Sequence, residues 1–271
     1  MNKKLIAIDL DGTTLNNHSL ITSETKQAIQ KVMTQGHIVS IATGRAFRTS
    51  NLFYKQLGLD SPMVNYNGAW CHHPLDTHWK NGYHKSLNRE IALSLTSFQK
   101  YSEVRLISAE SRNQVYMDRE AYYPYQIDPE KEPLNPLPFQ ENTLGEDPTS
   151  VNIFVEDEKY IPYIQEKVIE QYGNEVEVRT WGGPSPTLEI VSLGIQKAMG
   201  VERIAQSYNI DQKDILAFGD EANDYEMIQY AGLGVAMNNG IEELQNIADD
   251  VTSYSNHENG LADYLTKYFD L

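Results

Sequence analysis

Two aspartates separated by one residue stand near the start of the chain, directly after a short apolar run. Asp9 and Asp11 follow Leu5-Ile6-Ala7-Ile8, which has the pattern of a strand buried on both faces in a parallel sheet. A third carboxylate from another strand would complete an oxygen-rich pocket for Mg²⁺, which prefers hard oxygen ligands and shares them with a substrate phosphate. Alone, this spacing is more typical of a solvated turn. Joined to further polar residues, it indicates phosphoryl transfer, with Asp9 attacking phosphorus and Asp11 moving the proton.

Further polar residues stand where other strands are expected to end. Thr43 follows the second strand-like run and offers a hydroxyl beside the flexible Gly44 amide, and Asp220 and Asp224 follow a late strand. Lys197, early in a predicted helix, supplies a mobile point charge that offsets the carboxylates. Because ligands collect beyond the carboxyl ends of parallel strands, we expect these side chains to converge with the two early aspartates.

The elements that must position these residues alternate between strand and helix at both ends of the chain. This rhythm predicts a doubly wound, Rossmann-like parallel sheet in the α/β class. The expected strands are 5–8, 37–42, 63–66, 215–218 and 233–236, and the expected helices are 22–35, 45–57, 195–208, 223–231 and 261–268.

The pattern changes in the middle of the chain, where an α+β segment interrupts the first rhythm. The expected elements there are helices 87–101 and 159–172 and strands 104–108, 114–118, 151–155, 176–181 and 187–191, with a proline-rich loop over 124–138. We therefore predict a core domain of residues 1–82 and 190–271 and an inserted α/β cap of residues 83–189. Tyr122, Tyr123 and Trp181 line a ligand pocket in this cap or belong to its core, and the pattern leaves both open.

Composition excludes several classes of protein. The 271 residues carry 22 Lys and Arg against 38 Asp and Glu, a net charge of −16, which disfavours nucleic acid as a partner. A single cysteine, Cys71, excludes an internal disulfide and a multi-thiolate zinc site. No apolar run is long enough to span a bilayer, and the residues after Met1 lack a signal-peptide core, so we expect a cytoplasmic protein without a membrane partner.

Taken together, the motifs resemble those of the haloacid dehalogenase (HAD) superfamily of phosphohydrolases. The matching segments are Asp9-Leu10-Asp11-Gly12-Thr13, Ala42-Thr43-Gly44-Arg45, Lys197 and Gly219-Asp220-Glu221-Ala222-Asn223-Asp224. Their order, the long interval between Thr43 and Lys197, and Asn67-Gly68-Ala69 are similar to the Cof-type, class IIB branch, which carries an α/β cap in that interval. One departure is Gln196-Lys197-Ala198, where family members often have Ser-Lys-Gly.

The resemblance implies a Mg²⁺-dependent phosphatase of small phosphorylated metabolites, with Asp9 as nucleophile and Asp11 as general acid and base. It implies that Mg²⁺ binds the Asp9 and Asp220 carboxylates and the Asp11 backbone carbonyl, while Asp224 supports the metal site. The phosphoryl group would be held by Thr43, Gly44, Lys197, Asn223 and the Leu10 amide. Arg45, Asn67 and Gly68 are possible substrate contacts.

Several functions remain open from the sequence. By family analogy the substrate is a sugar phosphate, with pyridoxal phosphate and a phosphorylated flavin precursor as further candidates. A phosphomutase would use the same residues but retain a phosphorylated product. From other classes, a signalling receiver domain also phosphorylates an aspartate beside Mg²⁺, although such domains are shorter, and a catalytically inactive binding module would not need this whole set of residues. The sequence does not determine the oligomeric state.

Overall fold

The computed structural model describes residues 2–112, 114–121, 135–181 and 185–271 and divides the chain into two compact units. The core unit comprises Met1–Arg45, Ser50–Tyr83 and Gln196–Leu271. The inserted unit comprises Ala46–Thr49 and His84–Ile195. Each unit has its own sheet and its own apolar core.

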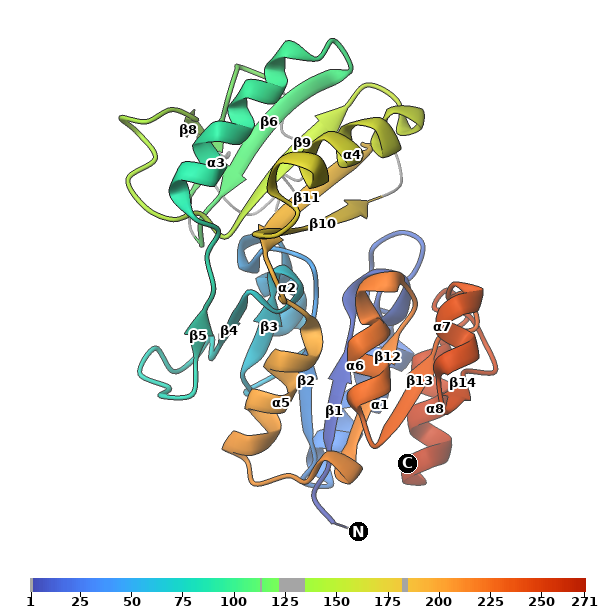
Figure 1. The fold of residues 1–271 in the computed structure, drawn as a ribbon. Coiled ribbons are helices and arrows are strands. Elements are labelled where there is room, and N and C mark those ends of the chain that lie inside the picture. Colours follow the sequence, from blue (N-terminus) through green and yellow to red (C-terminus); the bar gives the residue numbers. More distant parts are fainter. Residues whose placement is uncertain (1, 113, 122–134, 182–184) are drawn as a thin grey trace. The chain divides into compact units, whose positions relative to one another are not determined.

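A parallel five-stranded sheet forms the centre of the core unit (Figure 1). In spatial order its strands are β14 (Asp250–Val251), β13 (Leu233–Ala236), β12 (Ile215–Gly219), β1 (Leu5–Ile8) and β2 (Ile38–Ile41). The chain runs outward from β1 to β2 on one side and from β12 through β13 to β14 on the other. The β1–β12 pair is therefore the topological switch point, where open α/β sheets bind ligands at the carboxyl ends of their strands.

The helices of the core unit lie on both faces of this sheet. They are α1 (Ser23–Thr34), α2 (Phe47–Leu57, of which the core unit includes the part from Ser50 onward), α5 (Lys197–Ser207), α6 (Tyr225–Tyr230), α7 (Glu242–Ile247) and α8 (Gly260–Phe269). The β1–α1–β2 and β12–α6–β13 connections run in opposite directions, so right-handed crossovers place α1 and α6 on opposite faces. The predicted doubly wound α/β core is thus confirmed. No helix within the described ranges is long and apolar enough to cross a membrane.

The region after β2 differs from the prediction. β3 (Met63–Asn65) meets the parallel sheet through a bridge between Ala42 and Val64, but it pairs antiparallel with β4 (Trp70–His72) in a separate sheet that also contains β5 (Tyr83–His84). The predicted strand over 63–66 is therefore present and parallel to the β2 segment at this one bridge, but its antiparallel pairing with β4 was not predicted. The reason is turn chemistry: Tyr66, Asn67 and Gly68 have φ of 51°, 54° and 106°, which folds the chain back on itself.

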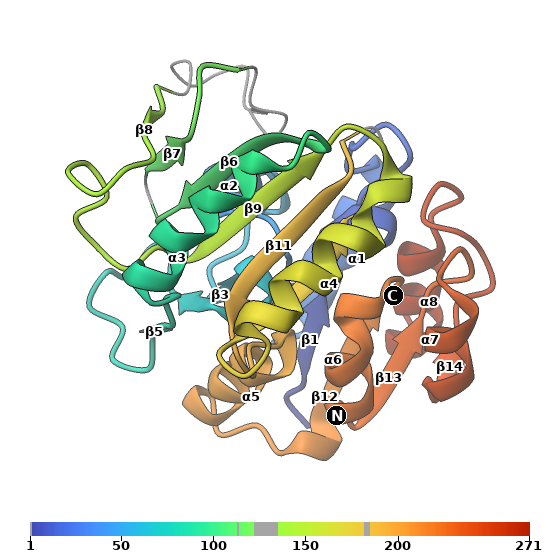
Figure 2. The same cartoon turned by 45° about the horizontal axis from the view of Figure 1, so that its top comes forward.

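The inserted unit contains a six-stranded sheet in the order β10-β11-β9-β6-β7-β8. Its elements are α3 (Arg89–Leu95), β6 (Val104–Glu110), β7 (Val115–Met117), β8 (Leu137–Pro138), β9 (Ser150–Val155), α4 (Ile161–Tyr172), β10 (Val176–Trp181) and β11 (Thr187–Ser192). Helices α3 and α4 lie on the same face of this sheet (Figure 2). The end of the predicted proline-rich loop is instead strand β8, which pairs parallel with β7. Tyr122 and Tyr123 lie outside the described residues.

Candidate active site

Three aspartates meet at the switch point of the core sheet. Asp9 follows β1, Asp220 follows β12, and Asp224 lies in the turn that precedes α6. All three are buried, and one carboxylate oxygen from each lies within 4.8 Å of the others. The structure thus brings together acidic residues that are more than 200 positions apart in the chain.

A buried lysine joins two of these acids. Lys197 is the first residue of α5, and its side chain is fully buried. Its Nζ lies 2.7 Å from Asp9 Oδ1 and 2.7 Å from Asp224 Oδ1. The prediction of a mobile charge was therefore wrong, because two carboxylates at hydrogen-bond distance fix the ammonium group.

Backbone N–H groups and one hydroxyl group hold further carboxylate oxygens of Asp220 and Asp224 in place. Asp224 Oδ2 accepts hydrogen bonds from the backbone N–H groups of Asp220, at 3.1 Å, and Glu221, at 3.3 Å. Asp220 Oδ1 accepts a hydrogen bond from Thr13 Oγ1 at 2.9 Å. Both oxygens of Asp224 are thus engaged within the protein, which suits a supporting position rather than direct metal ligation.

The cluster has more negative than positive charge. Burial raises the pKa of Asp9 to about 7, against the opposing effect of the Lys197 ammonium group. Burial, together with the charge of Asp9, raises the pKa of Asp220 to about 8. For Lys197, burial disfavours the charged form, but Asp224 and Asp9 outweigh this effect and raise its pKa. Three carboxylates around one ammonium group therefore form a site that attracts further positive charge.

This donor set fits Mg²⁺. The ion prefers oxygen ligands, and it usually takes a few carboxylates together with water and substrate phosphate. Asp9 and Asp220 each have an oxygen directed to the cluster, and Asp224 holds the surrounding backbone and Lys197.

The turn after β1 explains why a glycine follows Asp11. Gly12 has a φ of 72°, and a Cβ at this position would lie 1.9 Å from Asp220 Oδ2. The turn is also fixed by Thr14, whose Oγ1 donates to the Asp9 carbonyl at 2.5 Å, and it contains the buried Leu10. Glycine therefore allows the nucleophile loop to approach the Asp220 carboxylate closely.

Asp11 is not part of the acid cluster formed by Asp9, Asp220 and Asp224. Its side chain is 53% exposed, and its two oxygens accept hydrogen bonds from Arg45 Nε, at 2.6 Å, and Nη2, at 2.5 Å. The Arg45 guanidinium also stacks over the Phe53 ring, 5.2 Å from its centroid. The structure therefore places Arg45 against Asp11.

The remaining predicted site residues belong to two adjoining turns. Thr43 is buried, its Oγ1 accepts a hydrogen bond from the Arg45 backbone at 3.1 Å, and its carbonyl accepts one from the Asn67 backbone at 3.1 Å. Gly44 lies between Thr43 and Arg45, which form the first of these two hydrogen bonds. Asn223 Nδ2 donates to Asn67 Oδ1 at 2.9 Å, which connects the β3–β4 turn to the turn after β12.

Gly68 has a structural function that its sequence position did not reveal. A Cβ at Gly68 would lie 2.1 Å from the carbonyl oxygen of Gln196, the residue before Lys197. Sequence reasoning also missed Asn239, whose Nδ2 donates to the Gly12 carbonyl at 2.8 Å. Its position just after β13, at the same edge of the sheet as the acids, was the available signal.

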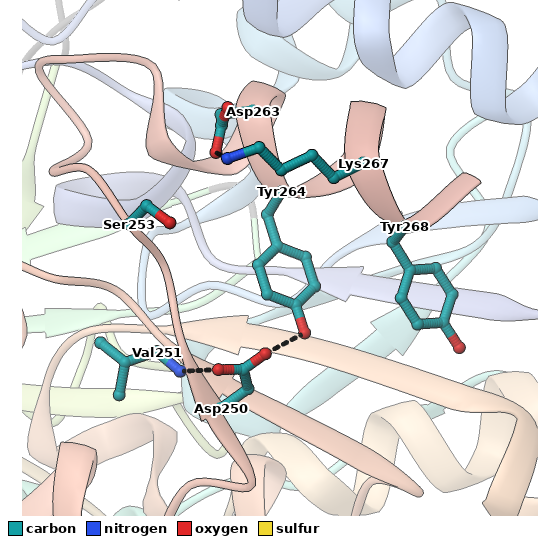
Figure 3. A pocket seen from close by; sticks show the side chains of 7 residues that line it. All are labelled: Asp250, Val251, Ser253, Asp263, Tyr264, Lys267 and Tyr268. Atoms are coloured by element: carbon teal, nitrogen blue, oxygen red, sulfur yellow. Dashed lines mark hydrogen bonds and ion pairs between the residues drawn. The ribbon is translucent and has the colours of Figure 1, made fainter. Parts of the chain in front are cut away.

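A separate pocket lies between β14 and α8 at the edge of the core sheet (Figure 3). The carboxylate of Asp250 accepts hydrogen bonds from Tyr264 Oη, at 2.9 Å, and from the Val251 backbone, at 2.8 Å. Lys267 and Asp263 form an ion pair at 2.8 Å. Because these polar groups already satisfy one another, the acid cluster is the stronger candidate for an active site.

Comparison with known proteins identifies the family and agrees with the fold. The model of the haloacid dehalogenase-like hydrolase family matches residues 6–265, so the chain belongs to this family. It is 38% identical over 270 residues to the 5-amino-6-(5-phospho-D-ribitylamino)uracil phosphatase YitU of Bacillus subtilis, covering 98% of each chain.

Two solved structures show the same fold. A haloacid dehalogenase-like hydrolase from Bacteroides thetaiotaomicron has a TM-score of 0.80 at 23% identity, covering 99% of this chain and 100% of that one. The HAD subclass IIB sugar phosphatase BT4131 has a TM-score of 0.78 at 21% identity, covering 99% of both chains. The predicted family and the predicted class of enzyme, a HAD-type phosphatase, are thus confirmed, and the receiver-domain alternative is set aside.

Proposed function

We propose that this chain is a Mg²⁺-dependent phosphatase that hydrolyses small phosphomonoesters through an aspartyl-phosphate on Asp9. The observation that carries the proposal is the buried cluster in which Asp9 lies 2.7 Å from Lys197 and shares a site with Asp220 and Asp224. When bound by Asp9 and Asp220, Mg²⁺ supplies positive charge that reduces the repulsion between a carboxylate and a phosphate.

The first half-reaction transfers the phosphoryl group to the protein. An oxygen of Asp9 forms a bond to phosphorus while the bond from phosphorus to the substrate alcohol breaks, and Asp11 donates a proton to the departing oxygen. Lys197 holds the Asp9 carboxylate in a single orientation during this step. Phosphoryl oxygens would be bound by the Thr43 hydroxyl and by backbone amides that include those of Leu10 and Gly44, with Asn223 and Lys197 assisting.

The second half-reaction returns the protein to its starting state. Asp11, now ionised, takes a proton from a water molecule as the water oxygen attacks phosphorus, and the bond from phosphorus to Asp9 breaks to release inorganic phosphate. Asp11 accepts one hydrogen bond from Arg45 on each carboxylate oxygen, which leaves lone pairs on both oxygens for exchange of a proton with substrate or water. The inserted unit would act as the cap that selects the leaving group.

The test is phosphate release from a panel of phosphomonoesters with Mg²⁺ or with EDTA. The panel includes sugar phosphates, pyridoxal phosphate and 5-amino-6-(5-phospho-D-ribitylamino)uracil, the compound in the name of the 38% identical relative. We expect Mg²⁺-dependent turnover that Asp9→Asn abolishes while the far-UV circular dichroism spectrum is retained, since the substitution removes the nucleophile at nearly constant volume. Full turnover by Asp9→Asn would exclude the proposed intermediate.

A further inference from the structure

The nucleophile loop, residues 9–15, bends at a glycine. Asp11 has φ −75° and ψ 128°, and Gly12 has φ 72° and ψ −5°, which are close to the angles of a type II turn. Because glycine adopts positive and negative φ at little cost, Gly12 does not by itself hold the peptide that follows it in one orientation. That peptide joins Gly12 to Thr13, so further contacts must fix the position of the Thr13 side chain.

Thr13 connects this loop to the acid cluster. Its Oγ1 donates to Asp220 Oδ1 at 2.9 Å, and both residues are buried. The proposed function assigns the Asp220 carboxylate to Mg²⁺. A shift of the Thr13 hydroxyl would therefore change the direction of a proposed metal ligand.

Asn239 holds the peptide between Gly12 and Thr13 from a loop on another strand. Its Nδ2 donates to the Gly12 carbonyl at 2.8 Å. Asn239 follows β13, whereas the nucleophile loop follows β1, and β12 lies between these two strands in the sheet. The contact forms because the carboxyl ends of parallel strands share one edge of the sheet.

The segment that carries Asn239 is itself held by several hydrogen bonds. The Asn256 backbone N–H donates to Asn239 Oδ1 at 2.8 Å, so the Nδ2 group of the same amide is directed to Gly12. A residue that positions a functional site must itself be fixed by its surroundings, and Asn239 meets this condition. In addition, Gln245 Nε2 donates to three carbonyls of the segment, those of Met237, at 3.2 Å, Asn238, at 2.9 Å, and Gly240, at 3.0 Å.

Satisfying the Gly12 carbonyl does not by itself require an asparagine. Asn239 is exposed, and so is its hydrogen bond to Gly12. Water could therefore replace Asn239 as the donor at little cost in stability. What the fixed amide adds over water is a single position of this carbonyl.

We propose that Asn239 is a positioning residue for Mg²⁺ binding, which acts through the Gly12 carbonyl and the Thr13 hydroxyl on the Asp220 carboxylate. This inference rests on the proposed function, because it concerns the metal site of that reaction. In this role Asn239 provides no ligand to the ion. Its removal should therefore weaken Mg²⁺ binding while all proposed ligands remain, and an excess of Mg²⁺ should restore activity.

The first experiment measures Mg²⁺ binding by calorimetry without substrate. We expect Asn239→Ala to weaken binding about tenfold, which corresponds to the loss of one neutral hydrogen bond. Its melting temperature should stay within about 3 °C of that of the unmodified protein, because the side chain is exposed. Asn238→Ala is the matched control and should leave the Mg²⁺ affinity unchanged, because Asn238 is an exposed asparagine of the same segment that bonds to Thr252 and Gln245 through its backbone.

A double-mutant cycle separates positioning through Thr13 from a general disturbance of the site. Thr13→Val removes the hydroxyl and should weaken Mg²⁺ binding about tenfold. Because both changes act on the same carboxylate, Asn239→Ala combined with Thr13→Val should also weaken binding about tenfold, and not about 100-fold. With p-nitrophenyl phosphate, Asn239→Ala should lower kcat/KM about tenfold at limiting Mg²⁺ and less than about twofold at saturating Mg²⁺.

The inference is overturned by an unchanged Mg²⁺ affinity of Asn239→Ala, by an equal loss in Asn238→Ala, or by a double variant whose binding is about 100-fold weaker. A loss of kcat/KM that saturating Mg²⁺ does not restore overturns it as well. Failure of the proposed function gives a different result: the unmodified protein binds Mg²⁺ but releases no phosphate, and the titrations still decide the present inference. If the unmodified protein binds no Mg²⁺, both fail.

Discussion

Replacing Lys197 with methionine tests the charge balance of the acid cluster. The substitution keeps the length of the side chain but removes an ammonium group that lies 2.7 Å from both Asp9 and Asp224. All three groups are buried, so neither carboxylate can be solvated in its place. Breaking a buried ion pair by removing one partner destabilises a protein by about 3–5 kcal/mol.

Proton uptake by the acid cluster sets an independent upper limit on the loss in the free energy of unfolding. One further carboxyl of the cluster can become neutral by binding a proton, and at pH 7 this costs roughly 4 kcal/mol relative to an aspartate ionised in the unfolded chain. The cost decreases by about 1.4 kcal/mol for each unit of lower pH and is about 1.5 kcal/mol at pH 5. The native variant then holds more protons than its unfolded chain, so its stability relative to the unmodified protein falls as the pH rises.

The assay is urea unfolding at pH 5, 6, 7 and 8 in EDTA, with the free energy of unfolding compared between Lys197→Met and the unmodified protein. We expect a difference of about 4 kcal/mol at pH 7 that shrinks towards pH 5. The matched control is Lys267→Met, which removes an exposed lysine from its pair with Asp263 and should not move the urea midpoint. A difference below about 1 kcal/mol at pH 7, or one independent of pH, would refute the reasoning.

Two further predictions concern metal binding and the nucleophile loop. Burial raises the pKa of Asp220 to about 8 and that of Asp9 to about 7, so Mg²⁺ binding at pH 7 should release roughly one proton, and the affinity for Mg²⁺ should increase as the pH rises to 9. Calorimetry in two buffers of different ionisation enthalpy measures the number of protons released. Release of no proton would contradict the prediction. Gly12→Ala should lower kcat/KM at least about 100-fold, because its Cβ displaces Asp220. Gly36→Ala, also at positive φ but with nothing within 4 Å, should leave kcat/KM unchanged, and equal activities of the two variants would exclude the steric explanation.

The convergence of the acids was predictable because it depends on topology. Asp9 and Asp220 both follow buried strands, and the carboxyl ends of parallel strands share one edge of the sheet. The predicted strand rhythm therefore placed them together without any knowledge of distances. Short elements were harder to predict. Helix α7 has six residues and strand β14 has two, too few for a clear hydrophobic period.

The environments of Lys197 and Asp11 were not predictable, because both depend on tertiary contacts. A lysine at the start of a helix is ordinarily solvated, and only the contacts with Asp9 and Asp224 explain its burial. Asp11 follows Asp9 by two residues, but the positive φ of Gly12 belongs to a turn in which Asp11 meets Arg45. Neither contact leaves a periodic signal in the sequence.

Charge balance links this contact between Asp11 and Arg45 to the proposed chemistry. With all three clustered carboxylates ionised, they and Lys197 leave two negative charges, which a bound dication would neutralise. A bound phosphate dianion would then make the net charge of the site negative again. Among the site side chains described above, the remaining cation is Arg45, and the Asp11 carboxylate neutralises its charge. When Asp11 takes up the proton that it later donates, its own charge disappears and the guanidinium is left as a net cation. On this reasoning, protonation of Asp11 prepares the general acid and at the same time makes the positive charge of Arg45 available to the incoming phosphate.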